Sequence, residues 1–197
     1  MSKFTDKRYI EKFQEAQQRS SKIGLQHNNL KLDAELYDTK AIIDIARFSI
    51  GLMKAMGMHS TAEARSKCMI VHHAIQQELS VAGISSELTI GNVVLRDKPF
   101  IDGVTLQSLI SEISSPKYDQ PQDIHCWLTL RDGSILDFTV YSSLTSPEKP
   151  EPIEENYVYI EPYEHDPKHY YEPMLVGNEY LELTGAVETV FLAEQMP

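Results

Sequence analysis

Three residues of this chain have the types and the order that nucleophilic chemistry at a carbonyl group requires. Cys68 lies on the apolar face of a segment with helical spacing, and His125 and Asp137 lie in two later segments of strand-like composition. A thiolate is the nucleophilic form of cysteine, and a helix N-terminus or an adjacent imidazolium lowers the thiol pKa enough to form it. The imidazole in turn needs a carboxylate that fixes its tautomer and orientation. A cysteine on a helix, a histidine on a strand and an aspartate on the next strand form the layout that such chemistry requires.

The turn between the two strands decides whether His125 and Asp137 lie on the same face of the sheet. Arg131-Asp132-Gly133 is a hairpin signal. A two-residue turn would separate the two side chains, whereas a three-residue loop with Gly133 in the left-handed conformation makes one face wholly apolar. We therefore expect the three-residue loop, which puts Asp137 opposite Trp127 and diagonal to His125, close enough for a hydrogen bond. The apolar face would hold Cys126, Leu128, Leu130, Leu136, Phe138 and Val140.

The sequence leaves open where the helix that carries Cys68 begins. Ser60-Thr61-Ala62-Glu63 has the form of a capping box, and a helix that begins there would place Cys68 two turns inside. A fresh start at Ser66 would place Cys68 in the first turn, where the helix dipole favours a thiolate. In either case we expect Gly83 to end the helix.

Hydrophobic spacing and turn residues predict the remaining elements. Helices come first along the chain, then strands, then a loop-rich segment and a last helix. The expected segments are a helix around 9–16, a buried helix over 38–53, the Cys68 helix up to 82, strands at 86–95, 124–130 and 135–141, a short strand at 157–160 and a helix at 178–194.

Composition excludes several classes of protein. The 197 residues carry 18 Lys and Arg against 29 Asp and Glu, a net charge of −11. An acidic chain without a basic block is a poor partner for nucleic acid or for an anionic membrane surface. Two cysteines are too few for a disulfide framework or a four-cysteine zinc site. No apolar run has the length of a membrane span or the form of a signal peptide, so we expect a soluble, cytoplasmic protein.

The chain length fits a single domain over 1–197. We expect a helical N-terminal region at 1–58, a Cys-His-Asp core at 59–145, an acidic segment rich in Pro and Tyr at 146–177, and a C-terminal helix at 178–197. The simplest interpretation of the acidic stretch 147–172 is a solvated loop. The alternative is a cover over the active-site cleft, whose negative charge would favour basic substrates.

The ordered motifs resemble the transglutaminase-like superfamily, within the papain-like cysteine protease fold. The matching stretches are 66–74 around Cys68, 82–91 with its Gly-Ile step and closing glycine, 125–130 with His125-Cys126-Trp127, and 135–139 around Asp137. The resemblance implies an α+β fold with a papain-like, transglutaminase-like core. In that fold the nucleophile-bearing helix packs on an antiparallel sheet, with N-terminal helices and a C-terminal helix beside it.

The resemblance also implies a role for each residue. Cys68 would be the nucleophile, His125 the general base and acid, Asp137 its orienter and Trp127 an aromatic neighbour in the substrate cleft. The expected activity is that of a cysteine-dependent hydrolase or acyl transferase: a peptidase, amidase, deamidase or transglutaminase-like enzyme that forms a thioester. Its substrate would be a peptide, a protein or a small amide, and no metal or organic cofactor is implied.

Other interpretations of the same residues stay open. The protein could be a non-catalytic binding module or a pseudoenzyme on the same fold. A metal-dependent alternative is a zinc site in which Cys68, His72 and His125 supply three sulfur and nitrogen ligands. We instead expect His72 to be a core histidine whose hydrogen bonds are satisfied, and Cys126 to be an inert core residue.

Overall fold

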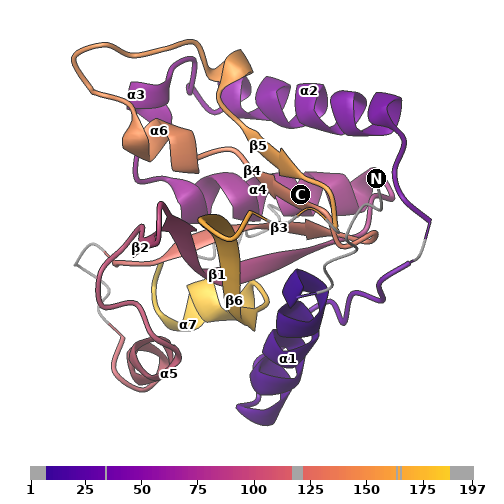
Figure 1. Cartoon of the computed structure of the whole chain (residues 1–197), viewed down its shortest axis with the longest axis vertical. Coiled ribbons are helices and arrows are strands. Elements are labelled where there is room, and N and C mark those ends of the chain that lie inside the picture. Colours follow the sequence, from indigo (N-terminus) through magenta and orange to yellow (C-terminus); the bar gives the residue numbers. More distant parts are fainter. Residues whose placement is uncertain (1–7, 34, 117–121, 163, 165, 187–197) are drawn as a thin grey trace, which may run out of the picture.

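The computed structural model describes residues 8–33, 35–116, 122–162, 164 and 166–186 (Figure 1). These residues form an α+β fold around one antiparallel sheet. The helices are α1 (Arg8–Lys22), α2 (Thr39–Ala55), α3 (Thr61–Ala64), α4 (Cys68–Val81), α5 (Leu106–Ser114), α6 (Val140–Leu144) and α7 (Glu179–Leu183), with a 3-10 turn η1 (Ile153–Glu155). The strands are β1 (Ser86–Leu95), β2 (Lys98–Pro99), β3 (His125–Leu130), β4 (Ile135–Asp137), β5 (Val158–Ile160) and β6 (His169–Val176). No helix within the described ranges is long and apolar enough to span a bilayer.

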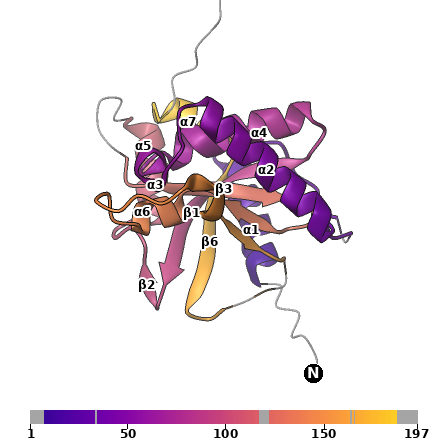
Figure 2. The ribbon, with the colours of Figure 1, turned by 90° about the horizontal axis from the view of Figure 1, so that it is seen from above.

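The sheet places α4 next to the strands that carry the predicted site. Its strand order is β2-β1-β3-β4-β5, and β6 pairs with the other edge of β1. Apolar side chains of α2 and α4 meet those of β1, β3 and β4 in the largest core cluster. Seen from above, α2 lies in front of α4 and the sheet (Figure 2), while α1 lies on the opposite side against β6. Helix α4 is therefore held between α2 and the sheet.

The hairpin between β3 and β4 has the predicted three-residue loop. The N–H of Leu130 donates to the carbonyl of Ser134 at 2.9 Å, and the N–H of Gly133 donates to the carbonyl of Leu130 at 2.9 Å. Gly133 has a φ of 84°, the left-handed conformation that glycine adopts without strain. Leu128 pairs with Leu136, so the predicted register is confirmed.

The second strand of the hairpin is shorter than the predicted 135–141. Strand β4 ends at Asp137, and Val140 begins α6 and packs on the opposite face of the sheet from Leu136. The reason is local: the Asp137 carboxylate accepts hydrogen bonds from the N–H groups of Thr139 and Val140 at 2.8 and 3.1 Å. This turn competes with the strand ladder, which alternation of apolar residues alone does not reveal. The predicted placement of Val140 on the apolar face is therefore wrong.

The C-terminal helix also differs from the prediction over 178–194. Helix α7 ends at Leu183, and Gly185 takes a φ of 72° while the N–H of Ala186 donates to the carbonyl of Leu181 at 2.8 Å. This is a glycine-ended helix terminus, so the helix stops before the apolar spacing does. Residues 187–194 of the predicted helix lie outside the described residues.

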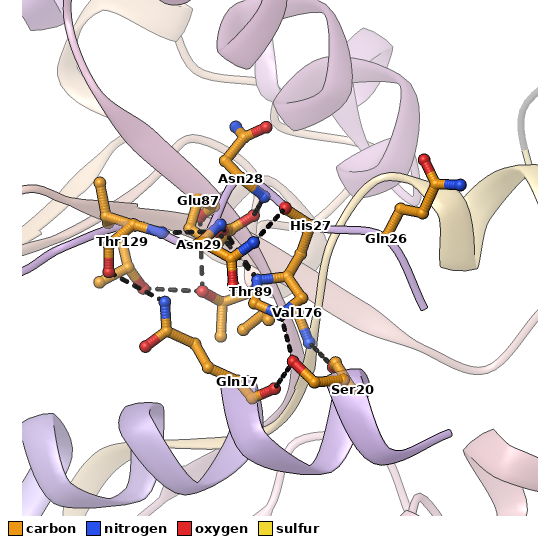
Figure 3. A network of polar contacts seen from close by, with 12 residues as sticks. Gln17, Ser20, Gln26, His27, Asn28, Asn29, Glu87, Thr89, Thr129 and Val176 are labelled. Atoms are coloured by element: carbon orange, nitrogen blue, oxygen red, sulfur yellow. Dashed lines mark hydrogen bonds and ion pairs between the residues drawn. The ribbon is translucent and has the colours of Figure 1, made fainter. Parts of the chain in front are cut away.

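A buried carboxylate fixes the segment between α1 and α2 to the sheet (Figure 3). Glu87 of β1 is fully buried and accepts hydrogen bonds from the N–H groups of Asn28 and Leu30 at 3.1 and 3.3 Å. Burial raises the pKa of this carboxyl above its usual range. The two backbone donors replace part of its lost hydration, so the segment is held where it packs α1 on the sheet.

The close approach of β1 and β6 gives a test of the fold. A Cβ on Gly91 would lie 2.1 Å from the carbonyl oxygen of Glu172 and 3.0 Å from the ring of Trp127. Gly91→Ala should therefore lower the free energy of unfolding by ~2 kcal/mol or more in urea denaturation.

Gly51 is the matched control, because it lies within α2 and a Cβ there would meet nothing within 4 Å. Gly51→Ala should raise the free energy of unfolding by ~0.5–1 kcal/mol through helix propensity. Equal stability of Gly91→Ala and the wild type would contradict the described pairing of β1 with β6.

Candidate active site

Cys68 is the first residue of α4, so it has the favourable position of the two that the sequence leaves open. The capping box at Ser60 does form, but the helix it starts, α3, ends at Ala64. Ser66 then takes a left-handed φ of 57° and Lys67 becomes the N-cap of α4. The N–H of Cys68 makes no hydrogen bond among the described residues and lies at the positive end of a 14-residue helix. The helix therefore favours a thiolate at this residue.

The predicted hydrogen bond between His125 and Asp137 is confirmed. His125 Nε2 and Asp137 Oδ2 lie 2.6 Å apart, and both side chains are almost fully buried. The Tyr171 hydroxyl donates to the same Oδ2 at 2.9 Å, while Oδ1 accepts from the N–H groups of Thr139 and Val140. Burial alone would raise the pKa of Asp137, but the charge of His125 and these donors hold it well below its usual range.

Asp137 influences the pKa of the Cys68 thiol through His125. Burial opposes its charged form, but the Asp137 carboxylate and contact with Cys68 raise the pKa of His125 to about 10. For Cys68, a hydrogen bond from the Cys126 thiol and contact with His125 outweigh burial and hold the pKa well below its usual range. Both shifts favour a thiolate beside an imidazolium. In its protonated form Cys68 has one acceptor among the described residues, the carbonyl of Ile124 at 3.5 Å.

Cys126 is buried as expected, but the expectation that it is inert is incomplete. Its thiol contacts Cys68, and burial raises its own pKa well above the usual range. It therefore keeps its proton and acts as a hydrogen-bond donor to the Cys68 sulfur. This contact is not apparent from the sequence, because Cys126 alternates onto the apolar face of β3 as a core residue does.

His72 has its hydrogen bonds satisfied inside the core, as predicted. Its Nδ1 lies 2.8 Å from the carbonyl of Cys68, and its Nε2 accepts from the N–H of Phe138 at 3.0 Å. Because Nε2 accepts, Nδ1 carries the proton and the ring is neutral; burial also lowers the pKa of His72. Neither nitrogen has a lone pair left for a metal, and the described ranges contain no group of three or more His, Cys, Asp or Glu placed to hold one. This geometry disfavours the zinc alternative.

Trp127 supports His125 from within the protein instead of facing an open cleft. The indole is fully buried, its ring lies 6.0 Å from the His125 ring, and its Nε1 donates to the Tyr9 hydroxyl at 2.7 Å. The Tyr171 ring packs edge-on against it at 4.9 Å. The sequence does not mark Tyr171 or Tyr9 as site residues, because each lies in an element distant in sequence from β3 and belongs to no motif.

The site is closed in this structure. Cys68 is 6% exposed, His125 2% and Asp137 0%. The ring of Phe100 packs edge-on against His125 at 5.5 Å, and the loop that holds it is anchored where Asn92 bonds both backbone groups of Ile101. A substrate of any size must displace side chains here before it reaches the sulfur.

The described residues thus join His125 to Asp137 by a hydrogen bond, and the pKa of Cys68 depends on His125. Comparison of the chain with protein-family models, curated proteins and solved structures found no match. The functional inference therefore depends on the geometry and electrostatics of Cys68, His125 and Asp137 themselves.

The charged pair makes stability depend on pH in a direction that can be worked out. In the folded protein His125 keeps its proton up to about pH 10, whereas in the unfolded chain it loses it near pH ~6.5. Its contribution is fully present below ~6.5 and is lost as the pH rises toward 10. The Cys68 thiolate acts oppositely: its contribution is present above ~8.5 and is lost as the pH falls.

Cys68→Ser removes the thiol titration, so this variant should lose stability steadily as the pH rises through the pKa of His125. Adding Asp137→Asn should abolish most of that alkaline loss and lower the free energy of unfolding near neutral pH by ~3 kcal/mol. Urea denaturation at a series of pH values measures both effects. Asp166→Asn, which removes a carboxylate from the exposed pair with His169, should leave the alkaline loss unchanged. An alkaline loss that survives Asp137→Asn would show that another group controls it.

Proposed function

We propose that this protein is a cysteine-dependent hydrolase or acyl transferase with a transglutaminase-like, papain-like core, acting on an amide carbonyl. The observation that carries the proposal is the buried chain of contacts from Asp137 through His125 to Cys68 at the start of α4. The order of nucleophile helix, histidine strand and aspartate strand on an antiparallel sheet supports the same family.

The proposed reaction begins with attack of the Cys68 thiolate on the carbonyl carbon. The carbonyl π electrons move to oxygen, and the free N–H of Cys68 at the helix N-terminus can donate to the resulting oxyanion. His125 then gives its proton to the leaving amine as the carbon–nitrogen bond breaks, which leaves a thioester on Cys68. Water or an acceptor amine, deprotonated by His125, attacks the thioester and releases the thiolate.

The coupled charges suit His125 for both proton transfers. Its pKa of about 10 depends partly on the neighbouring thiolate. When the sulfur becomes acylated its negative charge is gone, so the pKa of His125 falls and the proton leaves more readily. Asp137 keeps the ring orientation through both steps, because its two oxygens are fixed by Tyr171, Thr139 and Val140.

The burial of the site favours one alternative, a non-catalytic module or pseudoenzyme on the same fold. A thiol that is 6% exposed beside a histidine that is 2% exposed has little contact with solvent. The two functions differ in one measurable property: an enzyme needs Cys68 to react as a thiolate in the native protein.

The deciding measurement is the pH dependence of Cys68 alkylation by iodoacetamide, read by intact mass and peptide mapping. We expect Cys68 to react with a midpoint well below that of an ordinary thiol, and His125→Ala to move the midpoint up toward the ~8.5 of an ordinary thiol. The midpoint reports ionisation, so a closed site slows the reaction without moving it. Cys126 is the internal control and should stay unmodified until the protein unfolds, because it is fully buried.

A Cys68 midpoint near ~8.5, or protection of Cys68 in the native protein at every pH, would reject the enzyme in favour of the binding module. If the thiolate is present, screening of peptide and small amide substrates follows. Turnover should disappear in Cys68→Ala although the variant still unfolds cooperatively in urea, and turnover that persists in Cys68→Ala would remove the mechanism.

A further inference from the structure

A second site lies on the face of the sheet away from α4. It is a cavity of about 950 Å³ bordered by α1, β1, α6, β5 and β6. Neither Cys68 nor His125 lines it, although Tyr171 and Val140, which donate to Asp137, do. Residues of the acidic segment 147–172, among them Val158 and Ile160 of β5, border this cavity.

We propose that this cavity binds a small amphipathic anion, an apolar carboxylic acid of medium chain length. The volume falls in the range of small-molecule sites, ~300–1,000 Å³. The inner wall is apolar and comes from separate elements: Val93 of β1, Ile135 of β4, Val140 of α6, and Val158 and Ile160 of β5. An alkyl chain can displace water from such a wall, and the burial of apolar area favours its binding.

Basic side chains outnumber acidic ones in the lining of the cavity. Arg8, Lys12 and Arg96 line it, against Glu164 and Asp166, in a chain whose net charge is −11. The Asp166 carboxylate is already occupied, because it lies 2.9 Å from His169 Nδ1 and accepts from the N–H of Lys168 at 2.8 Å.

Arg96 is the basic group that would bind the carboxylate of the ligand. Lys12 shares its charge with Glu172 at 3.2 Å, whereas Arg96 is exposed and makes no hydrogen bond or ion pair with any described residue. It projects from the tight turn after β1, where Arg96 and Asp97 both have left-handed φ values of 52° and 63°. The turn thereby holds a guanidinium at the edge of an apolar cavity, which is the arrangement a fatty carboxylate needs.

Trp127 provides a direct readout of this cavity. It is the protein's single tryptophan. Its ring packs edge-on against Tyr171 and its Nε1 donates to the Tyr9 hydroxyl, and both tyrosines line the cavity. A ligand that presses on either tyrosine changes the surroundings of the indole and therefore its emission.

The test compares three probes with the same chain and different charge: octanoate, octan-1-ol and octylammonium. Titration of each into the wild type, followed by Trp127 fluorescence and calorimetry, should show saturable binding of octanoate at least tenfold tighter than of the other two. Absence of binding by all three overturns the site. Equal binding of the alcohol and the acid overturns the anionic class.

Two pairs of variants locate the site. Leu144→Glu adds a carboxylate at a cavity residue that is 52% exposed, and Val81→Glu makes the same change on α4 at a residue that is 85% exposed and outside the lining. Leu144→Glu should weaken octanoate binding at least tenfold, and Val81→Glu should leave it unchanged. Equal effects of the two variants would place binding elsewhere.

Arg96→Gln should weaken octanoate about tenfold without changing octan-1-ol, while Arg47→Gln on α2 should change neither. Unchanged octanoate affinity in Arg96→Gln contradicts the assigned role of Arg96. Binding should persist in Cys68→Ser, because that residue does not line the cavity. This result keeps a failure of the proposed enzyme function separate from a failure of the cavity site.

Discussion

The structure depends on one buried charge, the carboxylate of Asp137. A carboxylate without solvent is costly unless donors surround it, and here the donors come from three different elements. Oδ2 meets His125 of β3 and Tyr171 of β6, while Oδ1 meets the N–H groups that begin α6 and lies 3.5 Å from His72 of α4. Each of these elements must therefore sit in one position relative to β4, and a shift of one residue in the hairpin would leave the charge unpaired.

The same constraint joins the fold to the candidate chemistry. Asp137 ends a strand and starts a helix through its backbone donors, and it also orients the imidazole that faces the thiol. Trp127 stacks on the ring of His125, and Tyr171 packs edge-on against Trp127 behind it. The electrostatic effects follow from one group to the next. The Asp137 carboxylate raises the pKa of His125, and His125 together with Cys126 lowers the pKa of Cys68.

Local patterns in the sequence predict part of this arrangement, and long-range contacts decide the rest. The β3–β4 register and the His125–Asp137 bond follow from alternation and one glycine, because a slip would bury polar residues in an apolar face. The break before Cys68 does not follow locally. There Arg65 donates to the carbonyls of Ser143 and Thr145, so a segment far along the chain holds the residues that interrupt the helix. Tyr171 contacts Asp137, and Phe100 contacts His125, through tertiary packing that no local spacing encodes.

The energetic cost of the site argues for chemistry over a purely structural role. A buried thiolate and imidazolium lose favourable hydration, a free-energy cost that apolar residues of the same size do not have. Replacing such pairs by apolar residues is therefore often neutral or stabilising. The chain instead surrounds the pair with the start of α4, the thiol of Cys126 and the fully bonded Asp137. A binding module needs none of these charges, since its cleft could be packed with the residues that fill the rest of the core. Perturbed pKa values that reinforce one another in this way are typical of groups that exchange protons, which is why we favour the enzyme.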